Sequence, residues 1–475
     1  MGTSLREAER PAGATPSGRD RYMDLLRVAS LATVILGHWL MAAVAPRPDG
    51  TAHIGNLLTH LPEAQSLTWL FQVMPVFFYV GGFAHALSYR SLSRRNPDAP
   101  SVYAVFLRTR LHRLLRPTMA FVLVWGAAAL ALQLARVDSA LLDAALRLVT
   151  QPLWFIGVYL AMVALTPALL RAHERWGWAA FATLAGAAAT VDVLRFALGV
   201  PYAEFLNFAF VWLAVHQLGF LRADGRLTAP RLLAGAGLVG AGLLVAVGPY
   251  PLSMVGMPGE KVSNMAPPTL ALLCHGLWLV GAVELLRAPA TRLLARPRVW
   301  RGVVVASGFA MTAFLWHLTA MLGVYGALLA LDVPLPEPAT AVWWAQVPLR
   351  LAVAATLTAL LALLFRRFER PGTPAAPAAP RRWTGPLAAV GVTLALFGVL
   401  GLSTVGLADL LEGRSALLVA VRVTAPAAVV TALAGWYLVE RAGTSAGVRS
   451  RTPPARARCA EPGPPHTSRR PRSTA

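Results

Sequence analysis

Long apolar segments separated by short polar ones run along most of the chain. The apolar segments are continuous, and most are about 20 residues long, which is the length that a helix needs to cross the hydrocarbon core of a bilayer. Transmembrane strands would instead show apolar and polar residues in alternation. The pattern predicts an all-α polytopic membrane protein with about twelve transmembrane helices. The predicted spans cover residues 22–44, 65–88, 117–135, 153–171, 177–199, 204–221, 231–249, 268–286, 303–328, 341–365, 384–407 and 415–438.

The composition supports the same class. Hydrophobic residues make up 56% of the 475 residues and charged residues only 14%, with a mean hydropathy of +0.56. A soluble domain carries about 25% charged residues, so this chain has too few to cover a globule of its size. The two cysteines are Cys274, inside a predicted span, and Cys459, near the end of the chain. They allow no disulfide framework, and metal-ligand spacing is absent, so we expect no bound metal.

Arginines cluster in every second predicted loop. If the N-terminus is cytoplasmic, the loops on its side hold seven arginines between residues 90 and 116, five between 287 and 301 and five between 366 and 382. The loops on the opposite side hold only isolated basic residues. This alternation follows the positive-inside rule and predicts a multi-pass plasma-membrane protein with both termini in the cytoplasm. The net charge of +21 is therefore mostly a topology signal, with anionic lipid headgroups as partners, and does not indicate nucleic-acid binding.

Changes in composition divide the chain into five segments. The stretch before the first span is basic and has no apolar core, so it is not a cleavable signal peptide. A Pro/Ala-rich stretch after the tenth span cannot continue a helix, and the last part of the chain has nothing to bury. The predicted segments are a cytoplasmic N-terminal segment (1–21), a ten-span membrane domain (22–371), a linker (372–383), an extra two-helix hairpin (384–440) and a disordered basic tail (441–475).

The first span carries two ionisable residues, Arg27 and His38, within the sequence RDRYMDLLRVASLATVILGHWL. At 1.5 Å per residue they lie about 16 Å apart along a helix, so that Arg27 is near the headgroups and His38 is slightly past the midplane. Arg27 has a simple explanation, because it can extend to the interface and pair with Asp24. His38 cannot reach the interface. A hydrogen bond to a neighbouring helix and a functional role are about equally good explanations for it.

A second basic feature is the helical stretch FLRTRLHRLLRPTM at residues 106–119. On its own, this stretch is a positive-inside cluster. Guanidinium groups also match phosphate geometry, so the same stretch is a candidate site for a polyanionic cofactor. The candidate residues are Arg108, Arg110, Arg113 and Arg116.

Three more histidines, His216, His275 and His317, fall within predicted spans. Their depths are compatible with that of His38, which suggests a polar interior cavity. Depth alone does not show that these side chains meet.

Four further motifs accompany these residues in a fixed order: MPVFFYVGGF on the second span, PLWFIGVYL on the fourth, FLWH on the ninth and FERP at residues 368–371. Together with the Arg-x10-His spacing of Arg27 and His38, this ordered set resembles the membrane acyltransferase 3 family, in its actinobacterial-type branch, over residues 19–371. One position departs from the family pattern. The usual Ser-Gly after the aromatic run on the second span is Gly81-Gly82 here, so a role of that serine must be met differently.

The resemblance implies an enzyme that takes an acyl group, often acetyl, from cytoplasmic acyl-CoA. The acceptor is commonly a hydroxyl of a sugar-containing or other surface or secreted molecule. The resemblance also implies that His38 is the catalytic histidine and Arg27 its arginine partner, and CoA is then the expected ligand of the arginines in residues 106–119. Histidine can act as a general base at neutral pH or carry the acyl group as an acyl-imidazole, and both mechanisms stay open.

Two other classes fit the same composition. Twelve spans with both termini inside is also the layout of many secondary transporters, in which intramembrane histidines can carry protons. A former enzyme that now acts as a binding or scaffold protein is the third interpretation. The spans hold few acidic residues, and Asp192 and Glu284 lie near span ends, which disfavours proton-coupled transport. Acyl-CoA turnover that requires His38 would distinguish an enzyme from a carrier.

Overall fold

The structure is a computed structural model, and it describes residues 20–46, 52–96, 101–136, 140–257, 259–369, 383–411, 413 and 415–445. Within these ranges the chain is mainly helical, and its named strands form two short antiparallel hairpins. The all-α prediction is therefore confirmed. The predicted N-terminal segment up to residue 19, the linker apart from its last residue and the tail beyond residue 445 lie outside the described residues.

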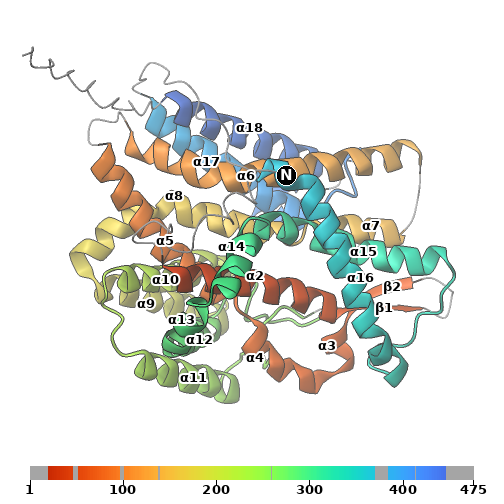
Figure 1. The fold of residues 1–475 in the computed structure, drawn as a ribbon, viewed down its shortest axis with the longest axis horizontal. Coiled ribbons are helices and arrows are strands. Elements are labelled where there is room, and N and C mark those ends of the chain that lie inside the picture. Colours follow the sequence, from red (N-terminus) through yellow and green to blue (C-terminus); the bar gives the residue numbers. More distant parts are fainter. Residues whose placement is uncertain are drawn as a thin grey trace, which may run out of the picture.

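Long helices form the body of the molecule, and several of them run along its longest axis (Figure 1). They are α2 (Arg21–Met41), α5 (Met74–Arg95), α6 (Val102–Leu134), α8 (Leu153–Trp176), α9 (Trp178–Phe196), α10 (Asn207–Ala223), α11 (Pro230–Val247), α12 (Leu270–Leu285), α15 (Ala310–Ala330), α16 (Ala341–Phe365), α17 (Thr384–Val405) and α18 (Ala425–Ser445).

Shorter elements connect these helices. The helical ones are α3 (Leu57–His60), α4 (Thr68–Phe71), α7 (Ala140–Leu148), α13 (Arg287–Leu294) and α14 (Pro297–Ser307), with the 3-10 turns η2 (Pro62–Leu67), η3 (Ala203–Leu206) and η4 (Arg366–Phe368). The strands are β1 (Ala42–Pro46) paired with β2 (Ala52–Asn56), and β3 (Ser415–Leu418) paired with β4 (Val421–Thr424).

Membrane-length helices match most of the predicted spans. In the described ranges, ten helical segments are long and apolar enough to cross a bilayer, or eleven if α12 and α13, which meet at a 50° bend, count as one span. Each of the first eleven predicted spans corresponds to one of these segments. The twelfth differs, because residues 415–424 pair as β3 and β4 and α18 begins only at Ala425. This helix carries Glu440 and Arg441 near its end and is not among the membrane-length segments.

Side-chain caps fix where two of the central helices begin. Asp20 accepts hydrogen bonds from the backbone N–H groups of Tyr22 and Met23 at the start of α2. Ser101 accepts one from the N–H group of Ala104 at the start of α6. Each cap satisfies backbone donors that have no partner within the first turn. Since α2 and α6 carry the predicted site residues, these caps help to set the register at which those residues face the interior.

Glycines allow α5 and α10 to come into direct contact. A Cβ on Gly82 of α5 would lie 2.0 Å from the carbonyl oxygen of His216 on α10. A Cβ on Gly219 of α10 would lie 2.3 Å from the carbonyl oxygen of Tyr79 on α5. Any side chain at either position would push the two helices apart. The second glycine of the Gly-Gly pair on α5 therefore has a packing role.

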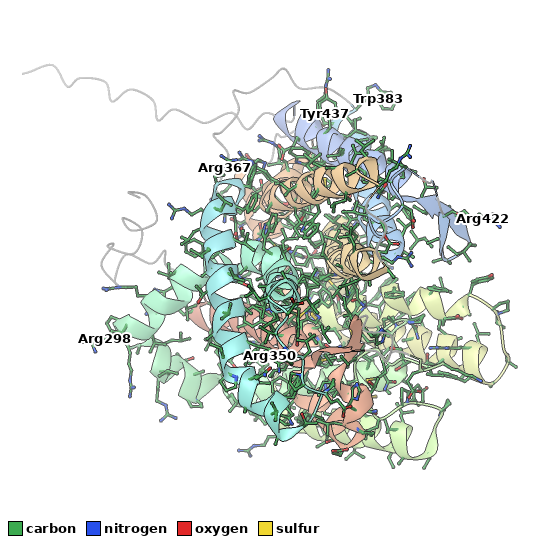
Figure 2. The ribbon with its side chains drawn as sticks, turned by 90° about the vertical axis from the view of Figure 1, so that its right-hand side faces the viewer. Arg298, Arg350, Arg367, Trp383, Arg422 and Tyr437 are labelled. Carbon is green, nitrogen blue, oxygen red and sulfur yellow. The ribbon has the colours of Figure 1, made fainter. Side chains whose placement is uncertain are left out.

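The C-terminal helices α17 and α18 pack closely against each other and lie along α6 and α8 (Figure 1). Gly398 of α17 and Gly435 of α18 permit this contact, because a Cβ on either would lie 2.2–2.3 Å from backbone of the other helix. Glu440 of α18 accepts a hydrogen bond from Arg108 of α6 at 3.2 Å. On the outer face, Trp383 and Tyr437 project away from the bundle (Figure 2). The two helices thus cover one side of α6, the helix that carries the predicted cofactor residues.

Candidate functional site

One end of the bundle is rich in arginine. Asp20, before α2, and Arg95, at the end of α5, line one cavity there. Arg90 of α5 donates a hydrogen bond to Glu174 at the end of α8 and pairs with Asp224 just after α10. We call this the arginine-rich end: the end at which α2 begins and α5, α8 and α10 finish.

His38 on α2 meets His317 on α15 in the interior. The His38 Nδ1 and His317 Nε2 atoms are 2.8 Å apart, and the two rings are nearly parallel, with an interplanar angle of 9°. Trp39 Nε1 donates to the backbone carbonyl of His317 at 3.0 Å, which fixes α2 against α15. His317 is fully buried, whereas His38 keeps partial exposure. The structure therefore brings together two of the four intramembrane histidines expected from the sequence.

The hydrogen bonds of this pair determine its tautomers. The Phe314 carbonyl oxygen lies 2.5 Å from His317 Nδ1, and a carbonyl can only accept, so His317 Nδ1 carries a proton. In neutral His317, Nε2 is then an acceptor, and His38 Nδ1 must donate to it. The remaining nitrogen, His38 Nε2, consequently holds a lone pair. No hydrogen bond joins it to another described residue, and the His38 side chain is partly exposed, so an acceptor hydroxyl or an acyl group can approach it.

Arg27 lies on the wall of a cavity of about 480 Å³ at the arginine-rich end. Its guanidinium pairs with Asp24 one turn earlier, at 3.5 Å, and its side chain is 40% exposed. The predicted ion pair is therefore present, and it leaves Arg27 facing the cavity. Gly81, Arg110 and Tyr159 line the same cavity from α5, α6 and α8.

The four predicted cofactor arginines on α6 point in different directions. Arg110 enters the cavity and donates to the Ala84 carbonyl at 2.8 Å. Arg108 faces α18 instead, where it pairs with Glu440. Arg113 is exposed, and the Arg116 guanidinium lies 6.0 Å from the ring centre of Phe368. The four arginines therefore lie on different faces of α6, and Arg110 is the one that lines the cavity.

Gly81, at the position where the resemblance implies a serine, lines this cavity. A Cβ at Gly81 would lie 3.6 Å from Tyr159 Cε2, an ordinary van der Waals contact. A serine would therefore fit, and its absence leaves the Tyr159 side chain uncovered at this wall.

A second histidine pair holds Tyr159. His85 Nε2 lies 2.9 Å from the Tyr159 hydroxyl, and His85 Nδ1 lies 3.0 Å from His216 Nε2. Both histidines are fully buried. His85 was not singled out from the sequence, and no local signal there distinguishes it. His275, the fourth predicted intramembrane histidine, bonds to the Trp69 carbonyl at 2.8 Å and belongs to neither pair.

Glu369, from the FERP motif, caps the helix that carries His317. Its carboxylate accepts hydrogen bonds from the backbone N–H groups of Met311 and Thr312 in the first turn of α15. A carboxylate is favourable at a helix N-terminus. Burial raises the pKa of the Glu369 carboxyl, whereas these hydrogen bonds and the positive charge of Arg27 oppose the rise. Glu369 of the FERP motif therefore fixes the start of α15, the helix that carries His317, within the electrostatic influence of Arg27.

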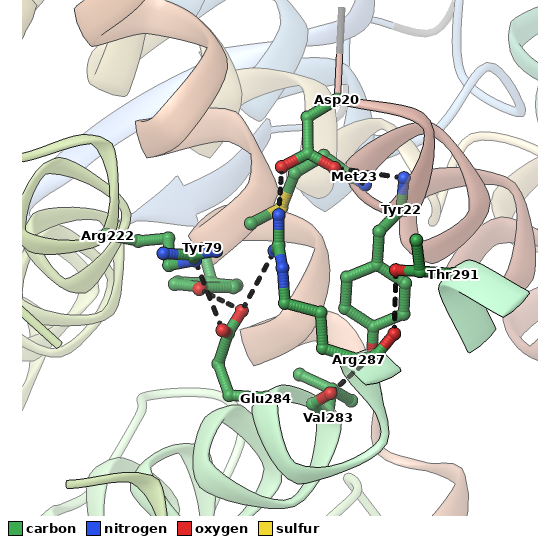
Figure 3. A network of polar contacts seen from close by, with 9 residues as sticks. All are labelled: Asp20, Tyr22, Met23, Tyr79, Arg222, Val283, Glu284, Arg287 and Thr291. Carbon is green, nitrogen blue, oxygen red and sulfur yellow. Dashed lines mark hydrogen bonds and ion pairs between the residues drawn. The ribbon is translucent and has the colours of Figure 1, made fainter. Parts of the chain in front are cut away.

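A network of ion pairs fixes the start of α2 (Figure 3). Arg287, at the α12–α13 bend, pairs with Asp20 and approaches Glu284. Glu284 also pairs with Arg222 at 3.1 Å and accepts a hydrogen bond from the Tyr79 hydroxyl at 2.6 Å. The network connects α2, α5, α10 and α12, so it holds the helix of Arg27 and His38 in register with its neighbours.

Asp192 and Glu284, the acidic residues near span ends, both have structural contacts. Glu284 belongs to the network just described. Asp192 accepts hydrogen bonds from Asn207, from the Tyr250 hydroxyl and from the backbone N–H of Leu270 at the start of α12. Carboxylates bonded in this way stabilise helix ends and contacts, and the arrangement gives proton-coupled transport no further support.

A bundle of membrane-length helices with a histidine pair in its interior and a basic cavity at one end defines a polytopic membrane protein with an internal site. The family model described as an acyltransferase domain, Acyl_transf_3, matches residues 20–367. The chain belongs to this acyltransferase 3 family and is a membrane acyltransferase, which confirms the predicted resemblance; the actinobacterial-type branch stays a prediction. No curated protein and no solved structure gave a match.

Proposed function

We propose that the protein transfers an acyl group, expected to be acetyl, from acyl-CoA to a hydroxyl of a sugar-containing or other small-molecule acceptor. The observation that supports this most strongly is the lone pair on His38 Nε2, which is oriented by His317 and has no protein partner in the described chain. A neutral imidazole in this state is ready to accept a proton or to attack a carbonyl.

In the general-base mechanism, His38 Nε2 takes the proton of the acceptor hydroxyl while its oxygen bonds to the thioester carbonyl carbon. The C–S bond then breaks, and the imidazolium returns the proton to the CoA thiolate. The products are an ester and free CoA thiol. In the covalent mechanism, Nε2 bonds to the acyl carbon first, and the C–S bond breaks to release the CoA thiolate. The acceptor oxygen then bonds to the acyl carbon, the C–N bond to the imidazole breaks, and the hydroxyl proton neutralises the thiolate. His317 orients His38 in both.

The donor enters from the arginine-rich end, which we assign to the cytoplasm on the positive-inside rule. Arg27 and Arg110 line the cavity there, and guanidinium groups suit the phosphates of CoA. Arg113 and Arg116 lie further along α6 and are proposed to assist, whereas Arg108 supports α18. Arg27 and His38 are about 16 Å apart along α2, a gap that the extended pantetheine arm of CoA can bridge.

The test is thioester turnover by membranes that carry the full-length protein. His38→Ala should reduce release of CoA thiol from acetyl-CoA to the level of membranes without the protein. His60→Ala, an exposed histidine on α3, is the matched control and should behave as wild type. If His38→Ala inserts normally and still turns over acetyl-CoA at the wild-type rate, the proposed function of His38 is wrong.

A further inference from the structure

The donor cavity does not reach the histidine pair. Phe77 lines the cavity, whereas neither His38 nor His317 does. On α5, Phe77 lies further from the arginine-rich end than Gly81, Ser88 and Arg95, which line the same cavity. Phe77 is therefore at the inner end of the cavity.

Three aromatic rings connect this inner end to the histidines. The Phe77 and Phe155 ring centres are 4.9 Å apart, in an edge-to-face arrangement. The Phe155 and Phe314 centres are 5.0 Å apart, again edge to face, and the Phe314 ring centre is 5.7 Å from that of His317. Phe155 and Phe314 are each only 2% exposed. The rings come from α5, α8 and α15, so they close the space between three helices.

We propose that Phe77, Phe155 and Phe314 form a gate, the aromatic gate, between the donor cavity and His38. This inference rests on the proposed function, because the thioester must reach His38 while the CoA phosphates stay near Arg27 and Arg110. The pantetheine arm passes the uncovered wall at Gly81 and displaces the Phe77 ring from its contact with Phe155. In the closed state, the gate keeps the thioester and the water of the open cavity away from His38, whose remaining exposure is not to this cavity.

The closed gate has a chemical consequence. Water that reaches His38 together with a thioester would replace the acceptor: Nε2 would take a proton from water, its oxygen would bond to the acyl carbon, and the C–S bond would break. The products would be a free acid and CoA thiol, and the acyl group would be lost. The gate therefore limits hydrolysis, and a smaller side chain at Phe77 should increase it.

The gate can be tested by separating binding in the cavity from chemistry at His38. Phe77→Trp places a larger ring in the passage. The purified full-length variant should still bind adenosine 3′,5′-bisphosphate, the part of CoA without the phosphopantetheine arm, but should turn over acetyl-CoA at least about 10-fold more slowly. Phe397→Trp is the matched control, because Phe397 on α17 is 54% exposed and does not line the cavity. It should match wild type in both measurements.

Phe77→Leu gives the opposite change and keeps an apolar side chain. It should raise acetyl-CoA hydrolysis, measured without acceptor, by about 2- to 10-fold, the factor that corresponds to the loss of one edge-to-face ring contact. Adding His38→Ala should remove this increase. Unchanged hydrolysis in Phe77→Leu, or unchanged turnover in Phe77→Trp, would overturn the gate while leaving the proposed function in place. If the wild type releases no CoA at all, the proposed function fails, and the gate with it.

Discussion

The bundle contains two histidine pairs with similar hydrogen bonds and different surroundings. His38 and His317 lie 2.8 Å apart, and His85 and His216 lie 3.0 Å apart. In the second pair both rings are fully buried, and the outer nitrogen of His85 bonds to Tyr159. Each pair keeps one ring nitrogen without a partner among the described residues, but His216 Nδ1 is buried, whereas His38, which carries the unpartnered Nε2, stays partly exposed. An intramembrane histidine can therefore react when a hydrogen bond orients one of its lone pairs and a substrate can also reach that lone pair.

The largest expected loss of acyl transfer follows from substitution in the first pair, His38 and His317, which act together. His38→Ala should lower acyl transfer by about 10²- to 10⁴-fold, the usual contribution of a general base, and by more if His38 carries the acyl group. Adding His317→Ala to His38→Ala should lower the rate little further, because His317 acts through His38. Rates of the two single variants and the double variant measure this coupling. Independent, multiplicative losses would contradict it.

A smaller effect is expected when only the orienting residue changes. His317→Ala leaves the His38 Nδ1–H donor without its acceptor, which costs about 1–3 kcal/mol, or a rate loss of about 5- to 160-fold. His317→Gln can still accept through its carbonyl oxygen, so it should recover part of the loss. The measurement is kcat for both variants at saturating acetyl-CoA. Equal losses in the two variants would show that His317 does not act by accepting this hydrogen bond.

Substitutions at the arginine-rich end should change the affinity for CoA. Arg110→Gln should weaken CoA binding by about 1.5–3 kcal/mol if one charge-assisted hydrogen bond to a phosphate is lost. Arg108→Gln is the matched control on the same helix, because Arg108 pairs with Glu440 and does not line the cavity. Isothermal titration with CoA compares them. A larger loss in Arg108→Gln than in Arg110→Gln would reverse the assignment.

The smallest effect on catalysis is expected in the second pair. His216→Ala leaves His85 Nδ1 without a partner, so the free energy of unfolding should fall by about 1–3 kcal/mol. The rate per folded molecule should change little, because His216 does not line the cavity. Thermal unfolding in detergent and turnover of the folded fraction give the two numbers. A stable variant that is nevertheless inactive would place His216 in the reaction.

Much of the fold followed from the sequence because hydrophobic length determines the spans. The sequence did not show that residues 415–424 form a hairpin of strands or that the helix before His317 breaks between α14 and α15. Both depend on local turns that a long apolar segment conceals.

The candidate site was predictable in part. The spacing and the motif identify Arg27 and His38, which lie on one helix. His317 is 279 positions away, and only the packing of α2 against α15 brings it to His38. The sequence alone could not show which arginines of residues 106–119 line a cavity, because that depends on which helices pack against each face of α6. That packing turns Arg110 inward and Arg108 toward α18.

The most direct test compares His38→Ala with His216→Ala in matched preparations of purified full-length protein, using acetyl-CoA labelled in the acyl group. The account predicts that His38→Ala stays folded, with no greater loss of thermal stability than His216→Ala because each leaves one buried histidine nitrogen unpaired, and transfers at least about 100-fold less label per folded molecule. It predicts that His216→Ala unfolds at a lower temperature and retains its rate per folded molecule. A fully active His38→Ala protein, with the loss of activity confined to His216→Ala, would contradict it.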